Sequence, residues 1–258
     1  FPSDGQSFSY TTFITNGATV TIYPHFSVLA ANQTYYVVID PGTFTDVGNT
    51  NYIGLSNTNA WRFTTKSAPS NPANVTVAAD GSADFLTVQG AVNSIATGTN
   101  ASQRVINVRN GVYTEIVNIS GRHNVTIRGQ NRLGTFIGYP NNATFQSANS
   151  GTTHARMAVK VNANDIFFET LTITNMTPQG GSQAEALMIE SNAKRCIINN
   201  CDIVSRQGVT LFAPESAGHG LLERQHEIDA LAVVIAQRED KVVEAQAHLH
   251  GIALDLLH

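Results

Sequence analysis

Residues 165–175 read DIFFETLTITN, and residues 195–205 read RCIINNCDIVS thirty positions later. The apolar positions of the first stretch recur in the second: Ile166, Leu171 and Ile173 correspond to Cys196, Cys201 and Ile203. A fixed period of this length, carrying strands, is typical of a β-solenoid, whose stacked coils bury every second side chain. The repeat therefore predicts stacked strands and places both cysteines in the core, where they serve as small apolar residues and form neither a disulfide scaffold nor a metal site.

Short apolar stretches extend this pattern toward the N-terminus. A strand is predicted at VTV (75–77), followed by a short helix with Phe85, Val88, Val92 and Ile95 on one face and Asp84 as its N-cap. The later stretches predicted as strands are RVINVR, EIVNIS, NVTIRG, TFIGY, MAVKV, DIFFE, LTITN, ALMIE, KRCIIN and CDIVS.

Residues 1–66 are predicted to be a separate module of short strands divided by turns. Period-two alternation is clear in TYYVVID (34–40), a turn-rich PGTFTDVGN follows, and AWRFTT (60–65) supplies a last strand. This arrangement resembles the bacterial immunoglobulin-like modules found beside secreted enzymes. The resemblance implies a β-sandwich with a spacer or adhesive role and with Trp61 in its core. Residues 67–73, rich in Pro and Ser, are predicted to be a linker.

Residues 213–258 differ in character from the rest of the chain. Apolar residues repeat there at intervals of seven, at Leu221, Ile228, Ile235, Val242, Leu249 and Leu256. This heptad pattern predicts one α-helix or a helical hairpin over residues 221–257, through which we expect self-association. Such a tail would also cover the open end of a solenoid that stops at residue 212. His248 and His250, two apart on a helix, point in opposite directions and do not form a metal site.

Three motifs follow one another along the predicted solenoid. GVYTE stands at residues 111–115, QAEAL at 183–187 and SRQGVTLF at 205–212. In this order they resemble the signatures GxYxE, QAVAL and QDTL of the pectin methylesterase (pectinesterase) family, with a resemblance that covers residues 74–207. It implies the N-terminal half of that family's catalytic domain. We therefore expect a mainly β fold with a partial right-handed parallel β-helix over residues 74–212.

The resemblance also implies a chemistry. In that family one aspartate attacks the methyl ester and a second transfers the proton, while two glutamines stabilise the oxyanion and an arginine orients the nucleophile. Gln183 and Gln207 match the two glutamines, whereas Gly208 stands where the acid/base aspartate belongs. Counterparts of the nucleophile and the arginine are not found between Thr210 and His258. We therefore expect a chain that acts on or binds methyl-esterified polygalacturonate and is catalytically incomplete.

Glu185 is the carboxylate nearest to a motif glutamine. It lies two residues from Gln183, so on a strand both side chains would face the same side. Two interpretations stay open: contact with substrate in a cleft, or a tolerated polar surface residue. Glu115 of the GVYTE motif is interpreted as structural. Four other carboxylates are interpreted as residues of the solvent face or the rung corners: Asp165, Glu169, Glu190 and Asp202.

Composition narrows the remaining classes of function. A net charge of −4 and a pI of 6.0 argue against binding to nucleic acid or to an anionic membrane. No apolar run approaches the roughly 20 residues that span a bilayer. Charged residues make up only 13%, which favours an extracellular all-β protein, and we expect a secreted bacterial one. The opening residue Phe1 predicts a processed or truncated start.

The expected partner is pectin or polygalacturonate, and neither a cofactor nor a metal is expected. Two alternatives are a non-catalytic extracellular module that binds polysaccharide or acts as a spacer, and a display protein that oligomerises through residues 221–257.

Overall fold

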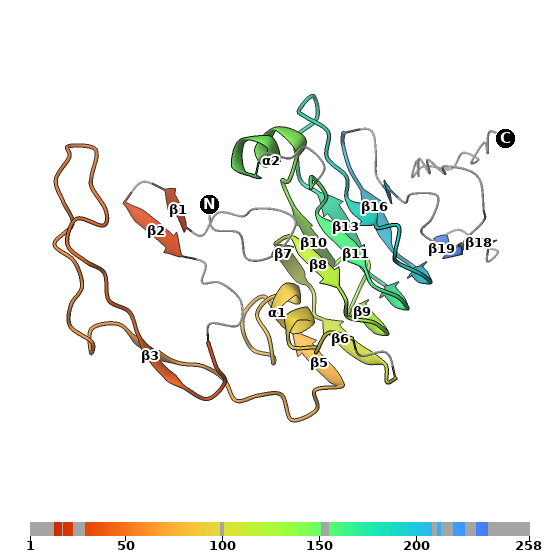
Figure 1. The fold of residues 1–258 in the computed structure, drawn as a ribbon, viewed down its shortest axis with the longest axis horizontal. Coiled ribbons are helices and arrows are strands. Elements are labelled where there is room, and N and C mark those ends of the chain that lie inside the picture. The colour runs from red at the N-terminus through yellow and green to blue at the C-terminus, as the bar shows by residue number, and fades with distance from the viewer. Residues whose placement is uncertain are drawn as a thin grey trace. The chain divides into compact units, whose positions relative to one another are not determined.

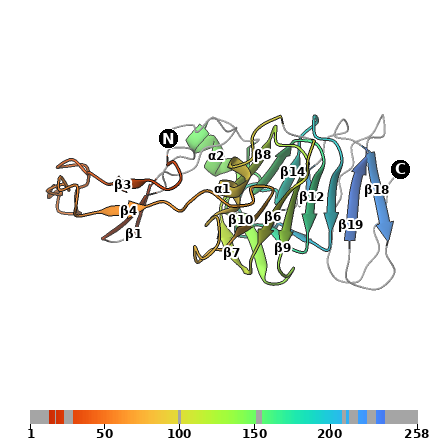
Figure 2. The same ribbon diagram turned by 90° about the horizontal axis from the view of Figure 1, so that it is seen from below.

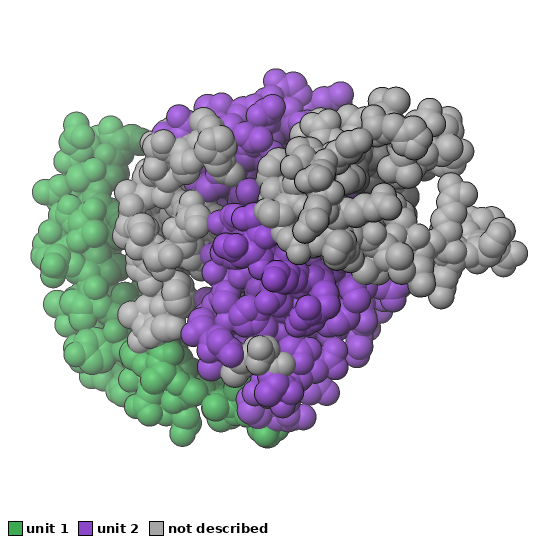
Figure 3. All heavy atoms as spheres, turned by 45° about the vertical axis from the view of Figure 1, so that its right-hand side comes forward, with its two compact units in different colours: residues 1–4, 10–70 green, residues 5–9, 71–258 purple. Residues whose placement is uncertain are grey.

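A computed structural model, drawn in Figure 1, describes residues 13–16, 18–22, 29–98, 101–150, 155–207, 211–212, 219–224 and 231–236. The chain divides into two compact units, coloured separately in Figure 3. The first unit comprises residues 1–4 and 10–70, and the second comprises residues 5–9 and 71–258. The boundary after Ser70 falls within the predicted linker. Among the described residues, no helix is long and apolar enough to cross a membrane.

The described strands of the first unit form two antiparallel pairs. The first pair is β1 (Phe13–Asn16) with β2 (Thr19–Ile22), and the second is β3 (Thr34–Tyr36) with β4 (Arg62–Thr64). The second pair lies in the two stretches that period-two alternation marks as strands. In the described part of this unit, neither pair is extended by a further strand.

The aromatic residues of this unit are only partly covered. Tyr35 and Phe63 stack across β3 and β4 with ring centroids 5.8 Å apart. Trp61, next to β4, is 46% exposed, so the prediction that it lies in a sandwich core is wrong. The reason is that β3 and β4 pair only with each other in the described part of the unit, which leaves the tryptophan beside a two-stranded ribbon.

The second unit is built of stacked parallel sheets, seen from two directions in Figures 1 and 2. The first sheet contains β5 (Asn74–Val77), β6 (Arg104–Val108), β9 (Val125–Gly129), β12 (Ile166–Glu169) and β15 (Cys196–Asn199). The second sheet contains β7 (Gly111–Thr114), β10 (Thr135–Tyr139), β13 (Thr172–Asn175) and β16 (Asp202–Val204). The third sheet contains β8 (Val117–Ser120), β11 (Val159–Asn162), β14 (Leu187–Ile189) and β17 (Leu211–Phe212).

From β6 onward the chain visits the three sheets in turn, and each strand pairs in parallel with the strand one circuit later. One strand from each sheet, such as β12, β13 and β14, forms one rung. The arrangement is mainly β, with stacked parallel sheets that are consistent with a partial parallel β-helix. Each stretch that the sequence marks as a strand of the solenoid contains a strand of the structure, so those predictions are confirmed.

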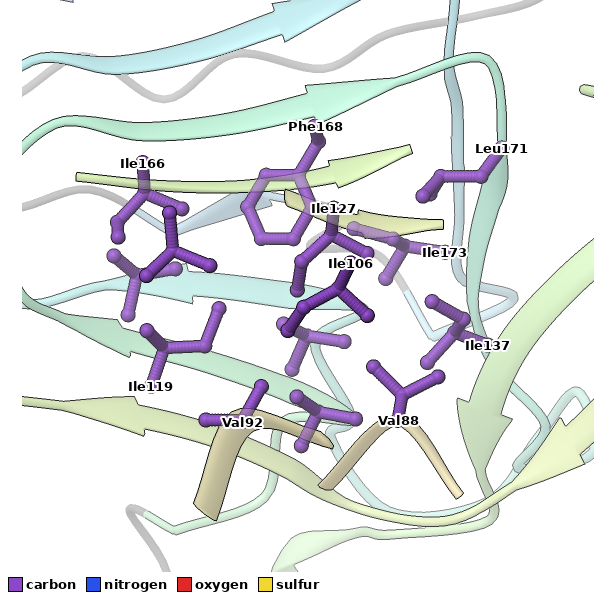
Figure 4. Close-up of a cluster of buried hydrophobic side chains, with 14 of the residues drawn as sticks. Val88, Val92, Ile106, Ile119, Ile127, Ile137, Ile166, Phe168, Leu171 and Ile173 are labelled. Carbon is purple, nitrogen blue, oxygen red and sulfur yellow. The ribbon is translucent and has the colours of Figure 1, made fainter. Parts of the chain in front are cut away.

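The rungs enclose a continuous apolar core, part of which is shown in Figure 4. Ile166 pairs with Cys196 and Ile173 with Ile203, which confirms the thirty-residue repeat as successive rungs. Both cysteines are buried and unbridged, as the repeat predicts. Burial raises the pKa of the Cys196 thiol to about 12 and that of Cys201 to about 11, so neither sulfur is a thiolate near neutral pH.

Helix α1 (Val88–Asn93) packs its apolar face against the first rungs. Val88 and Val92 are buried, as predicted. The N-cap, however, is Thr87, whose hydroxyl accepts a hydrogen bond from the Gly90 N–H at 3.0 Å. Asp84, the predicted cap, instead accepts from the Thr76 N–H of β5 at 2.8 Å. The cap prediction is wrong because this carboxylate fixes the turn after β5 before the helix begins.

A second helix, α2 (Ala143–Ser150), lies between β10 and β11 in the chain and is not predicted by the sequence pattern. The Ala143 N–H donates to the Gln183 carbonyl at 2.9 Å, and the Thr144 N–H donates to Ser182 Oγ at 2.9 Å. The first turn of α2 is therefore attached to the segment that precedes β14.

The described segments of the tail are strands. β18 (His219–Arg224) and β19 (Leu231–Ala236) pair with each other antiparallel, and β19 also pairs antiparallel with β15. The prediction of a helix over residues 221–257 is wrong for these segments. The LAVVIA sequence of β19 is rich in β-branched residues, and the edge of β15 offers main-chain hydrogen bonds, so strand pairing replaces the helix. The rest of that prediction lies outside the described residues.

Candidate functional site

The two glutamines of the sequence motifs lie just before neighbouring strands of the third sheet. Gln183 precedes Leu187 of β14 by four residues, Gln207 precedes Leu211 of β17 by four residues, and the two leucines are paired in register. A Cβ built on Gly181 would lie 3.4 Å from Nε2 of Gln207, which places the Gln207 amide beside the segment that leads to Gln183. The segments that carry the two glutamines therefore lie beside each other, before the N-terminal ends of two paired strands.

The two amides differ in their hydrogen bonding. Gln183 is exposed, and in the described part of the chain its side chain makes no hydrogen bond, while its main-chain carbonyl accepts from α2. Gln207 is partly buried, and its Nε2 donates to the Pro178 carbonyl. An amide nitrogen carries two hydrogens, so Gln207 retains one for another acceptor. Gln183 is thus the donor better placed to meet a ligand.

Glu185 does not share the exposure of Gln183. It is 4% exposed, and its Oε1 lies 2.7 Å from Nη2 and 2.8 Å from Nε of Arg156. The interpretation as a polar surface residue is therefore wrong. The strand alternation that would place both side chains on one side fails because β14 begins only at Leu187. Burial and the ion pair leave the carboxylate little access to a substrate, so its role in substrate binding stays a prediction that the geometry does not favour.

Carboxylates elsewhere on the rungs also have basic partners. Glu190 Oε1 lies 2.7 Å from Lys160 Nζ, which links β14 to β11. The same pattern joins other rungs through the pairs Glu169 with Arg128, Asp202 with Arg132 and Asp165 with Arg195. Each of these ion pairs joins residues of different coils. None of the four carboxylates is buried, which agrees with their interpretation as residues of the solvent face or the rung corners.

Glu115 of the GVYTE motif binds the N-terminus of α1. Its Oε1 accepts from the Val88 N–H and its Oε2 from the Gln89 N–H, both at 2.8 Å. The helix has no acidic residue in its own first turn, so this glutamate, 27 residues away in sequence from Val88, supplies the negative charge that a helix N-terminus favours. Burial nevertheless raises the pKa of Glu115 to about 7. The interpretation of Glu115 as structural agrees with these contacts.

Sequence reasoning did not single out Arg156 or the buried asparagines near Gln183. Asn141 and Asn175 are at most 2% exposed, and both donate to main-chain carbonyls around the Arg156–Glu185 pair. The signal in the sequence was weak because Asn is common throughout the chain and neither residue belongs to the motifs compared. One clue was available: Asn175 ends the strand TITN two residues after the inward Ile173, so alternation places this polar side chain on the buried side of the strand. In the described residues, no group of three or more His, Cys, Asp or Glu side chains could hold a metal ion.

Comparison with known proteins gives one consistent result. The sequence profile of the family described as Pectinesterase matches residues 74–216, which is more than half of the 258 residues. Pectinesterase 31 of Arabidopsis thaliana is 32% identical over 140 residues, which are 52% of this chain and 43% of that protein. Pectinesterase/pectinesterase inhibitor U1 of Solanum lycopersicum is 34% identical over 139 residues, which are 52% of this chain and 22% of that protein.

Among solved structures, the pectin methylesterase from carrot is similar at 27% identity, with 54% of this chain and 42% of that chain covered and a TM-score of 0.45. The matched region thus spans less than half the length of these proteins. It includes both motif glutamines and ends four residues after Phe212.

Proposed function

Because this chain belongs to the pectinesterase family, we propose that residues 74–212 form part of a right-handed parallel β-helix that binds methyl-esterified polygalacturonate. The observation that carries this proposal is the pairing of β14 with β17, because Gln183 and Gln207 each precede the paired leucines of these strands by four residues. Two amide donors on neighbouring segments suit the carbonyl oxygens of a row of esterified sugars.

We propose further that the chain binds this polymer without hydrolysing its esters. Hydrolysis needs a nucleophile and a proton donor beside the oxyanion donors. Gly208 provides neither, and the nearest carboxylate along the chain from Gln183, that of Glu185, is buried and paired with Arg156. An extracellular location, where pectin is found, belongs to the same proposal. The immunoglobulin-like assignment of residues 1–66 stays a prediction, which the four described strands of that unit do not decide.

The test is a binding measurement paired with an activity measurement. Isothermal titration of the full chain with highly methyl-esterified pectin is expected to show binding, and the same mixture is expected to release no methanol above the background without protein. Gln183→Ala is expected to weaken binding about tenfold, the scale of one hydrogen bond to a carbonyl. Gln179→Ala provides a matched control, because Gln179 is an exposed glutamine in the same loop.

The outcomes separate the two parts of the proposal. Absence of binding at a millimolar concentration of methyl-esterified galacturonate residues in the pectin would refute the proposed ligand. Methanol release in proportion to protein concentration would refute the lack of hydrolysis and leave binding intact. Equal losses in Gln179→Ala and Gln183→Ala would show that the loop rather than the motif glutamine makes the contact.

A further inference from the structure

A buried asparagine lies at the junction of the loops that surround Gln183. Asn175, the last residue of β13, is 2% exposed. Its Nδ2 lies 2.7 Å from the Asn141 carbonyl, 2.8 Å from the Glu185 carbonyl and 3.1 Å from the Arg156 carbonyl. Its Oδ1 accepts from the Thr177 N–H at 3.1 Å. One side chain therefore ties together three loops that are distant in sequence.

A second buried asparagine extends these contacts to α2. Asn141 is fully buried, and its Nδ2 donates to the carbonyls of Ala155 at 2.8 Å and Met157 at 2.7 Å. Its Oδ1 accepts from Nε2 of Gln146, a fully buried residue of α2, at 2.8 Å. The position of α2 is thus fixed by the same network that holds Asn175.

The network holds the backbone on both sides of the exposed Gln183 side chain. On the N-terminal side, Ser182 Oγ accepts from the Thr144 N–H, and the carbonyl of Gln183 itself accepts from the first N–H of α2. On the other side, the Glu185 carbonyl accepts from Asn175, and the Glu185 carboxylate is held by Arg156. A side chain that extends into solvent from a backbone fixed within two residues has fewer conformations to lose when it binds a ligand.

We propose that Asn175 is a positioning residue that sets the direction of the Gln183 amide toward the ester carbonyl of the polymer, an inference that rests on the proposed function. Replacement of Asn175 by alanine removes this donor from the Glu185 and Arg156 carbonyls. The Glu185 carbonyl keeps the Ala158 N–H at 3.0 Å, so the backbone near Gln183 stays folded but is held less tightly. The amide remains present but loses its alignment. The expected loss in affinity is therefore comparable with the loss caused by removal of the amide itself, about tenfold.

A double-mutant cycle on the full chain tests this inference. A general loss of structure weakens binding whether or not Gln183 is present, whereas a loss of alignment weakens binding only when Gln183 is present. The probe is a fully methyl-esterified hexagalacturonate, and its Kd is measured for the original chain, Asn175→Ala, Gln183→Ala and the double variant. If Asn175 acts through Gln183, Asn175→Ala weakens binding about tenfold alone but less than about twofold when Gln183 is already alanine.

Thr172→Ala is the control on the same strand. Thr172 is also buried, and its hydroxyl donates to the Arg132 carbonyl, away from Gln183. Thr172→Ala is expected to lower the thermal stability of the chain. Its effect on Kd is expected to be the same in the original chain and in the Gln183→Ala variant. If the alanine variant of Asn175 does not fold, Asn175→Ser, which keeps one donor, replaces it in the cycle. The expected loss in affinity is then smaller than about tenfold, and it still depends on the presence of Gln183.

Two results would overturn the inference while the proposed function survives. One is an equal increase in Kd on Asn175→Ala in the original chain and in the Gln183→Ala variant, which indicates a structural role alone. The other is an unchanged Kd in the single variant. Absence of binding by the original chain is a different outcome, because it refutes the proposed function and this inference with it.

Discussion

The solenoid and the first unit are both built from short strands, but they differ in how many neighbours each strand has and in how far its side chains are buried. In the solenoid, β12 pairs with one strand on each side, and the inward Ile166 and Phe168 are fully buried. In the first unit, β3 pairs only with β4 among the described strands, and Tyr36 and Trp61 are about half exposed. Strands of similar length thus gain much more burial when each coil covers the next.

Substitution of a phenylalanine in each region gives the largest expected contrast. Phe168→Ala creates a cavity in the core and should lower the free energy of unfolding by about 4 kcal/mol. Phe63→Ala should lower it by less than about 1 kcal/mol, because Phe63 is 37% exposed. Urea denaturation followed by far-UV circular dichroism measures the solenoid, and fluorescence of Trp61, the single tryptophan, measures the first unit. Similar losses for the two variants would break the comparison.

Within the solenoid, the buried Arg156–Glu185 ion pair is compared with the more exposed Arg128–Glu169 pair. Glu185→Ala leaves Arg156 without its carboxylate in a covered site and should destabilise the chain by about 3 kcal/mol. Glu169→Ala removes the partner of Arg128, whose side chain is 49% exposed, and should cost less than about 1 kcal/mol. Urea denaturation of each variant measures both losses. An equal cost for the two variants would mean that the Arg156 site is as well solvated as the surface.

The pH dependence of Glu115 is the next largest expected effect. Burial raises its pKa from 4.5 to about 7, so the folded chain binds this proton more tightly than the unfolded chain does. The stabilisation from this group is full below pH 4.5 and is lost as the pH rises through about 7. Relative to Glu115→Gln, the free energy of unfolding of the original chain should fall by about 2 kcal/mol between pH 5 and pH 8. A constant difference between the two chains over this range would contradict the raised pKa.

The cap of α1 gives the smallest expected effect. Thr87→Ala removes the acceptor for the Gly90 N–H and should cost about 1 kcal/mol. Thr87→Ser keeps the hydroxyl and should be nearly neutral. Thermal unfolding at pH 6 measures both variants. A loss in the serine variant as large as that in the alanine variant would assign the effect to packing of the threonine methyl group instead of the cap.

The solenoid was predictable because its signal repeats. Cys196 could be placed in the core from the thirty-residue spacing alone, since a side chain stacked on the buried Ile166 has to be buried as well. The tail was not predictable in the same way. The apolar residues of Leu231–Ala236 fit a heptad and a strand equally well, and the free edge of β15 decided between them.

The candidate site was predictable only in part. The resemblance of their motifs to those of the family identified Gln183 and Gln207, and each motif leads into one of two paired strands, β14 and β17. The burial of Glu185 could not be predicted, because its partner Arg156 lies 29 residues away and their contact exists only once β11 and β14 are stacked.

The amino-acid sequence by itself determined the repeat and its inward residues, which depend on spacing along the chain, and the family, which depends on the residues of its motifs. The tertiary structure alone decided that Glu115 binds the start of α1, that Glu185 is neutralised and that Asn175 joins three loops. The physical reason is common to all three. A buried polar group takes the partner that folding brings within hydrogen-bond distance, and in a solenoid that partner comes from another turn of the coil.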